Sequence, residues 1–116
     1  MKISDVAKLI DAKIYCCSGS VEKEVRSACG CDMMSDVLAY VKDQSVLLTG
    51  LVNPQVIRTA EMMDIICIAF VRGKVPTEQM IELAEERGIV LMSTDMRLYP
   101  ACGTLYVNGL CDGEKT

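Results

Sequence analysis

The stretch Val46-Leu47-Leu48-Thr49-Gly50-Leu51-Val52-Asn53-Pro54 decides the fold of this chain. Its first three residues are aliphatic, which is typical of a strand buried on both faces, and Thr49-Gly50 follows them as a turn. Asn53 is a favoured N-cap residue, and Pro54 is favoured at the first helical position, where a missing N–H costs no hydrogen bond. The stretch therefore predicts a strand that leads through a short turn into a helix.

A second passage of the same kind lies further along the chain. Residues 65–71 form an apolar run, which predicts another buried strand. The loop Arg72-Gly73-Lys74-Val75-Pro76 then leads to Thr77, which we expect to cap a helix. Gly88 should end that helix, because glycine readily adopts the left-handed conformation that follows a helix.

The last part of the chain predicts one more strand and one more helix. Residues 89–92 are apolar and precede Ser93-Thr94-Asp95, and a short helix is expected from about Pro100 to Val107, ended by Asn108-Gly109. Parallel strands joined by helices require right-handed crossovers, which place helices on both faces of the sheet. The fold class is therefore predicted to be α/β, with three layers (α/β/α) and a mainly parallel sheet.

The part of the chain before residue 46 predicts two helices and two extended segments. Ser4 is expected to cap the first helix, and Ile14-Tyr15-Cys16 should form a short strand. Residues 21–28 predict either an edge strand or an extended connection. Either Ser35 or Asp32 should cap the next helix, which residues 42–45 close. The helices of the chain are expected to bury Val6, Leu9 and Ile10; Val37, Leu38 and Val41; Val56, Ile57, Ala60 and Met63; and Met80, Ile81 and Ala84.

Composition narrows the class of protein. The 116 residues fit a single domain over 1–116, with the residues after about 110 frayed. The net charge is −4 and the Lys and Arg residues are scattered, which argues against nucleic acid as a partner. No apolar run is long enough to cross a membrane, and the N-terminal residues lack a signal-peptide profile, so we expect a cytoplasmic protein.

Seven cysteines, an odd number, argue against a disulfide framework in a chain without an export signal. Cys67 lies in an apolar strand and should pack as a small hydrophobe. Four thiolates, enough in number for zinc or an iron–sulfur cluster, are present in the segments Cys29-Gly30-Cys31 and Cys16-Cys17. Neither pair has the usual CxxC spacing of such sites. We therefore expect no cofactor and no structural metal, so that chelators leave thermal stability unchanged. A redox-active thiol at Cys29 or Cys31, its pKa lowered by Arg26, is the alternative.

Several short segments resemble those of DRTGG domains. They are Asp32-Met33-Met34-Ser35-Asp36-Val37-Leu38, Thr49-Gly50, Arg58-Thr59-Ala60-Glu61, Phe70-Val71-Arg72-Gly73 and Ile89-Val90-Leu91-Met92-Ser93-Thr94. Together they span nearly the whole chain, which resembles the stand-alone members of that family. The resemblance implies a fold like the N-terminal domain of HPr kinase/phosphorylase and a regulatory role. Met33 and Met34 either line a surface for a partner protein or fill the core.

A ligand site is expected beyond the carboxyl ends of the parallel strands, where helix N-termini present N–H groups. Glycines there allow close backbone approach, Arg and Lys supply positive charge, and hydroxyls supply hydrogen bonds, which suits an anion such as a nucleotide phosphate. The alternative is that the same residues only make turns and cap helices. The candidate ligand-binding residues are Thr49, Gly50, Asn53, Arg72, Gly73, Lys74, Ser93 and Thr94.

The sequence argues against an enzyme. It has no histidine, and so no Ser-His or Cys-His pair, and no G-x-x-x-x-G-K-[ST] loop for gripping phosphates. We expect a non-catalytic regulatory or sensory module that binds a small anionic ligand, for example an adenine nucleotide, or a partner protein. A thiol- or metal-dependent redox accessory protein of anaerobic metabolism is the alternative. The high share of hydrophobic residues, 51%, predicts a homodimer.

Overall fold

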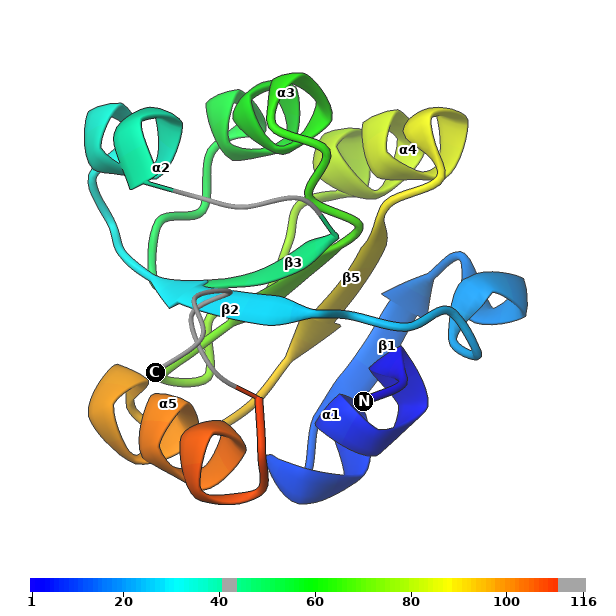
Figure 1. Cartoon of the computed structure of the whole chain (residues 1–116). Helices are drawn as coiled ribbons and strands as arrows, with labels where there is room; N and C mark the ends of the chain where they lie inside the picture. The colour runs from blue at the N-terminus through cyan, green and yellow to red at the C-terminus, as the bar shows by residue number, and fades with distance from the viewer. Residues whose placement is uncertain (41–43, 111–116) are drawn as a thin grey trace.

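The computed structural model describes residues 1–40 and 44–110, in which helices and strands largely alternate along the chain (Figure 1). The elements are α1 (Ile3–Leu9), β1 (Lys13–Cys16), the short 3-10 helix η1 (Ser18–Ser20), β2 (Ser27–Gly30), α2 (Met34–Tyr40), β3 (Ser45–Thr49), α3 (Pro54–Met62), β4 (Cys67–Phe70), α4 (Glu78–Arg87), β5 (Val90–Ser93) and α5 (Leu98–Val107). None of these helices has the length and apolar character needed to cross a membrane.

The strands form one sheet in the order β1-β5-β4-β3-β2. Strands β2 to β5 are parallel to one another, whereas β1 pairs with β5 in the antiparallel direction. The predicted α/β class and mainly parallel sheet are therefore confirmed. An antiparallel edge strand on an otherwise parallel sheet is common in such folds.

Helices cover both faces of the sheet, which gives the predicted three layers. Helices α2, α3 and α4 lie on one face and α1 and α5 on the other (Figure 1). Along β3, Val46 and Leu48 belong to the core under α1 and α5, while Leu47 belongs to the core under α2, α3 and α4. This alternation is the period-2 geometry of a strand, and burial on both faces explains why β3 is aliphatic.

The predicted helix ends at Asn53, Thr77 and Gly88 are confirmed. The Asn53 side chain accepts a hydrogen bond from the Gln55 N–H, and the Thr77 hydroxyl accepts one from the Met80 N–H. Gly88 adopts the left-handed conformation, with φ of 71°. Each of these residues satisfies backbone groups at the end of its own helix, which is why local sequence suffices to identify it.

Other predicted features of the first half are wrong. Helix α1 begins at Ile3, with Lys2 as its N-cap, so Ser4 lies inside the helix rather than capping it. Ser35 lies inside α2, whose first backbone hydrogen bonds are accepted by the Met33 carbonyl. Leu38 is 43% exposed, whereas Val37 is fully buried as predicted. A seven-residue helix on one face of the sheet has room for few inward side chains, and Val37 takes that position.

Two boundaries also differ from those predicted. The edge strand β2 covers Ser27–Gly30 rather than the whole of 21–28, and it pairs with β3. Helix α5 begins at Leu98, two residues before Pro100. Proline is tolerated there because the N–H groups of a first helical turn have no partner within the helix. The predicted inward Val41, the closing residues 42–43 and the frayed end 111–116 lie outside the described residues.

Candidate functional site

The carboxyl ends of the four parallel strands meet at one edge of the sheet. We call this edge the rim and define it as the eight candidate residues named above together with Asp32. The predicted groups lie where neighbouring strands end: Thr49 ends β3 and Gly50 follows it, Arg72-Gly73 lies just after β4, and Ser93 ends β5 and is followed by Thr94. The register pairs Thr49 with Phe70 and Phe70 with Ser93, which aligns the three strand ends.

Asp32 is the rim residue that sequence analysis assigned to a different role. Its carboxylate accepts hydrogen bonds from the Thr49 hydroxyl at 3.0 Å and from the Gly50 N–H at 2.7 Å. The same carboxylate lies 3.7 Å from the Arg72 guanidinium. Asp32, one of the two residues expected to cap the helix α2, instead holds the β3–α3 connection. It also neutralises the charge of Arg72, the main candidate cation.

Arg72 lies directly against Gly50. A Cβ atom built on Gly50 would overlap the Arg72 guanidinium, so the glycine is what allows the two to approach. Arg72 has a positive φ of 60°, which is uncommon for a residue with a side chain. Its N–H donates to the Met96 carbonyl, and the Gly73 N–H donates to the Thr94 carbonyl. Backbone hydrogen bonds therefore fix the turn that presents Arg72.

The predicted hydroxyl groups already have partners. Thr94 is buried and its hydroxyl donates to the Ile10 carbonyl at 2.6 Å. The Ser93 hydroxyl donates to the Lys74 carbonyl, and the Thr49 hydroxyl donates to Asp32. The Asn53 side chain caps α3. These four residues stabilise the rim in the described structure, and exposed Arg72 and Lys74 are its cations.

Three hollows on the surface of the described residues lie away from the rim. One of about 490 Å³ is lined by residues of α1 and the segment after α5, one of about 260 Å³ lies between α3 and α4, and one of about 740 Å³ lies beside Lys23, Arg26 and Asp64. None of these three is lined by a rim residue. The rim, as described, is an exposed charged surface rather than one of these hollows.

The two cysteine pairs lie at opposite edges of the sheet. Cys16-Cys17 belongs to the end of β1 and Cys29-Gly30-Cys31 to the end of β2, with β5, β4 and β3 between them. One metal cannot bind all four thiolates in this fold. Burial raises the pKa of Cys29, and the neighbouring Cys31, Cys102 and Asp36 add to the effect, so for Cys29 the lowering expected from Arg26 is wrong. Burial likewise raises the pKa of Cys102 and Cys67.

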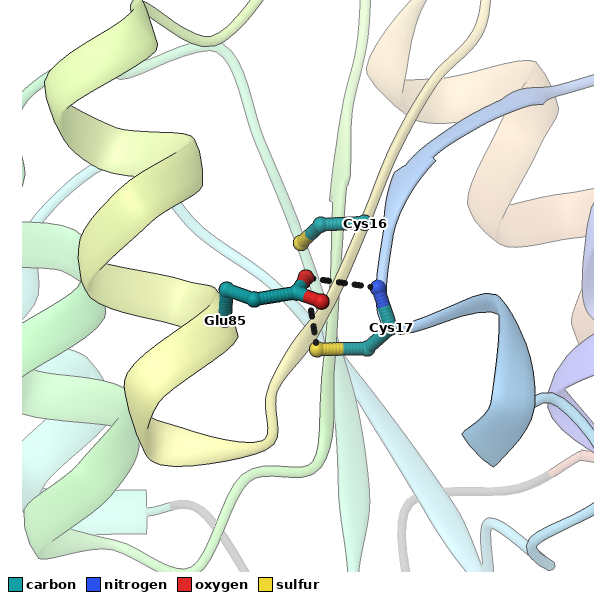
Figure 2. Close-up of side chains that lie close together, drawn as sticks. All are labelled: Cys16, Cys17 and Glu85. Carbon is teal, nitrogen blue, oxygen red and sulfur yellow. Dashed lines mark hydrogen bonds between the residues drawn. The ribbon is translucent and has the colours of Figure 1, made fainter.

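A second grouping was not predicted from the sequence. The sulfur atoms of Cys16 and Cys17 and a carboxylate oxygen of Glu85 lie within 4.8 Å of one another (Figure 2). Burial, followed by the influence of Cys16 and Glu85, raises the pKa of Cys17 to about 12. Glu85 lies 68 residues after Cys17, a separation that no local motif spans.

Comparisons with known proteins identify the fold but not a family. No protein-family model matches the chain, and no curated protein matches it in sequence. The chain is similar in structure to the CBS and DRTGG domains of the regulatory region of Clostridium perfringens pyrophosphatase, solved with its activator, diadenosine tetraphosphate. The TM-score is 0.72 over 97% of this chain, at 12% sequence identity. This chain covers about half, 48%, of that solved chain.

Proposed function

We propose that this chain is a regulatory module of the DRTGG type, with one domain over 1–116, that binds a small anionic ligand at the rim. The observation that carries the proposal is the similarity of nearly the whole chain to a regulatory region solved with a nucleotide activator. The motif-like segments of the sequence favour the DRTGG portion of that region as the counterpart of this chain. An adenine nucleotide is accordingly the first ligand to test.

The geometry of the rim supports an anion as ligand. Arg72 is exposed, its backbone is held by hydrogen bonds, and the absence of a side chain at Gly50 lets the guanidinium lie against the β3–α3 connection. A guanidinium forms strong charge-assisted hydrogen bonds with phosphate oxygens. Lys74 supplies a second exposed cation on the same connection. Asp32 opposes anion binding, because its carboxylate already satisfies Arg72 and the Gly50 N–H.

A chain without histidine lacks the usual acid/base group near neutral pH, which favours a non-catalytic role. The six described cysteines are free thiols, which suits a reducing, cytoplasmic location. The regulatory module is proposed to form a homodimer and to contact a partner protein.

Calorimetry with diadenosine tetraphosphate and ATP tests the proposal. Replacing Arg72 with Ala should weaken binding by about 1.5–3 kcal/mol, the worth of a hydrogen bond to a charged group. Asp32→Asn should strengthen binding, because it removes the competing negative charge while keeping a side-chain acceptor. Arg87→Ala is the matched control: Arg87 is also paired with a carboxylate, Glu61 at 2.6 Å, but it lies at the far end of α4.

Equal affinities of wild type and Arg72→Ala for the nucleotide would contradict the rim as its binding site. Failure of the wild type to bind any nucleotide or phosphorylated metabolite would leave a partner protein as the regulatory ligand.

A further inference from the structure

Cys16, Cys17 and Glu85 come from two elements that are distant in sequence. The cysteines lie at the end of the edge strand β1, and Glu85 lies in the last turns of α4 (Figure 2). The Cys17 N–H donates to the Glu85 carboxylate at 3.0 Å, which ties the strand end to the helix. The Cys17 sulfur lies 3.5 Å from the same carboxylate.

We propose that these three side chains form a binding site for a soft divalent cation of the Zn²⁺ class, with water as the fourth ligand. Zinc binds thiolate sulfur at about 2.3 Å and carboxylate oxygen at about 2.0–2.2 Å, so a tetrahedral site separates the two ligand atoms by about 3.5 Å. The observed separation between Cys17 and Glu85 is 3.5 Å. The third donor, the Cys16 sulfur, lies within 4.8 Å of both.

The donor set selects the class of ion. Two sulfurs favour Zn²⁺ and its spectroscopic substitutes over Mg²⁺ and Ca²⁺, which require oxygen ligands. An iron–sulfur cluster needs four protein ligands as a rule, and the described Cys29 and Cys31 lie at the opposite edge of the sheet. Two protein sulfurs, one carboxylate and a water are a set that zinc accepts.

Metal binding at this site exchanges protons for the cation. Without the ion each thiol has an acceptor for its one proton: the Ile89 carbonyl, 3.4 Å from the Cys16 sulfur, and for Cys17 either the Glu85 carboxylate at 3.5 Å or the Ala84 carbonyl at 3.7 Å. As the sulfurs bind the ion they release their protons to water, and nothing is oxidised or reduced. Hydrogen bonds hold the site together without the ion, so the metal-free chain should remain folded. An ion that binds only the folded chain adds stability that a chelator removes, which differs from the unchanged thermal stability expected from the sequence.

The site is independent of the rim. Because β1 is antiparallel, its last residue, Cys16, pairs with Leu91 near the start of β5, whereas the rim lies at the end of β5. Cys16 is buried, but Cys17 is partly exposed and Glu85 is exposed, which gives an ion access from solvent. Zinc binding and nucleotide binding can therefore be tested separately on the same protein.

The test is a Co²⁺ titration of the reduced, metal-free full chain under anaerobic conditions. Wild type should bind one equivalent and show the thiolate-to-cobalt charge-transfer absorbance, which added Zn²⁺ removes. Cys17→Ser and Glu85→Gln should each weaken binding at least tenfold. Glu85→Gln keeps an oxygen that accepts the Cys17 N–H, so this variant should remain folded by circular dichroism.

Cys31→Ser and Glu86→Gln are the matched controls, a thiol at the other edge of the sheet and the neighbouring exposed carboxylate on α4. Both should bind Co²⁺ as wild type does. The proposal is overturned if wild type shows no charge-transfer band, or if Cys31→Ser loses the band while Cys17→Ser keeps it.

Discussion

The Asp32 carboxylate connects three rim groups, of which the most distant in sequence, Arg72, lies 40 positions after it. It accepts hydrogen bonds from Thr49 and Gly50 and pairs with Arg72. The Thr49 hydroxyl is buried, and a buried donor that loses its acceptor is costly. The ion pair with Arg72 is half exposed on both sides, and such pairs contribute little. Hydrogen bonding rather than charge should therefore dominate the contribution of Asp32 to stability.

Two substitutions separate these contributions. Asp32→Ala should lower the free energy of unfolding by about 1–3 kcal/mol, because Thr49 and Gly50 lose their acceptor. Asp32→Asn keeps an acceptor oxygen and loses only the ion pair, so it should cost less than about 1 kcal/mol. Urea denaturation of the three proteins measures both values. An Asn variant as unstable as the Ala variant would show that the charge matters most.

Residue roles were predictable where the partner is local. Asn53 and Thr77 hydrogen-bond to N–H groups two and three residues ahead, and their roles as caps follow from short motifs. Asp32 also precedes a helix and has the chemistry of a cap, but its partners are 17 and 18 residues away. A short motif contains no information on which acceptor a distant hydroxyl will use, and so this role was missed.

At the scale of elements, the contact between β2 and α5 depends on a glycine. A Cβ atom on Gly30 would lie 2.5 Å from the Cys102 sulfur and 3.3 Å from Leu98. The two α5 side chains therefore pack directly on the backbone of the edge strand. This contact closes one side of the core under α1 and α5, to which Leu98 and Cys102 belong.

Gly30→Ala should consequently destabilise the protein by about 1–3 kcal/mol, the usual cost of overpacking a core. Cys102→Ala removes the sulfur that the new methyl group would meet, so the double variant should be more stable than the sum of the single changes predicts. Denaturant unfolding of the four proteins gives the coupling energy. Additive effects would mean that Cys102 does not restrict residue 30.

The elements themselves were largely predictable because their signals are repeated along the chain. Aliphatic runs and capped amphipathic segments identify β3 to β5, α3 and α4. The direction of β1 was not predictable, because strand pairing depends on contacts between residues about 80 positions apart, such as Lys13 and Ser93. The start of α5 at Leu98 was not predicted, because Pro100 was taken as the first residue of the helix. Proline is also tolerated as the third residue, which still belongs to the first helical turn.

At the scale of the whole molecule, the sheet order determines which cysteines meet. Strands β1 and β2 are consecutive in the chain but occupy opposite edges, which separates Cys16-Cys17 from Cys29 and Cys31. The same order places β1 beside β5, which follows α4, and so brings Cys17 to Glu85. Cysteine spacing in the sequence could not reveal either result, since both depend on topology.

The protonation of buried thiols should make stability fall at high pH. Burial raises the pKa of Cys29 and Cys102 above the ordinary thiol value of 9.0. Above about pH 9 the unfolded chain therefore loses thiol protons that the folded chain keeps, and the free energy of unfolding decreases as pH rises. Below that pH this contribution is fully present.

Urea denaturation under reducing conditions at several pH values checks this dependence. Wild type should lose stability from about pH 9 upward, and Cys102→Ala should show a shallower decrease because one such thiol is absent. A wild-type stability that is constant or rises above that pH would contradict the assignment.

The outer face of α5 is the surface on which we expect two copies of the chain to associate. Tyr99, Tyr106 and Val107 are 89%, 61% and 81% exposed, and their spacing of seven and eight residues places them on one face of the helix. Gly103, also exposed, lies between them and permits close approach of another helix. A two-fold dimer buries the same face of both copies, which is the commonest way to cover such a surface.

Light scattering should therefore give a mass of twice 12.7 kDa for wild type. The double variant Tyr99→Lys/Tyr106→Lys should give a single-chain mass, because two like-charged faces would be brought together in the dimer and each lysine would lose its hydration. Both side chains are exposed, so the variant should keep the fold. Met62→Lys, at a 72% exposed position of α3 on the opposite face of the sheet, is the control and should remain dimeric. A wild-type mass of 12.7 kDa at high concentration would remove the dimer, and dissociation by Met62→Lys alone would move the interface to α3.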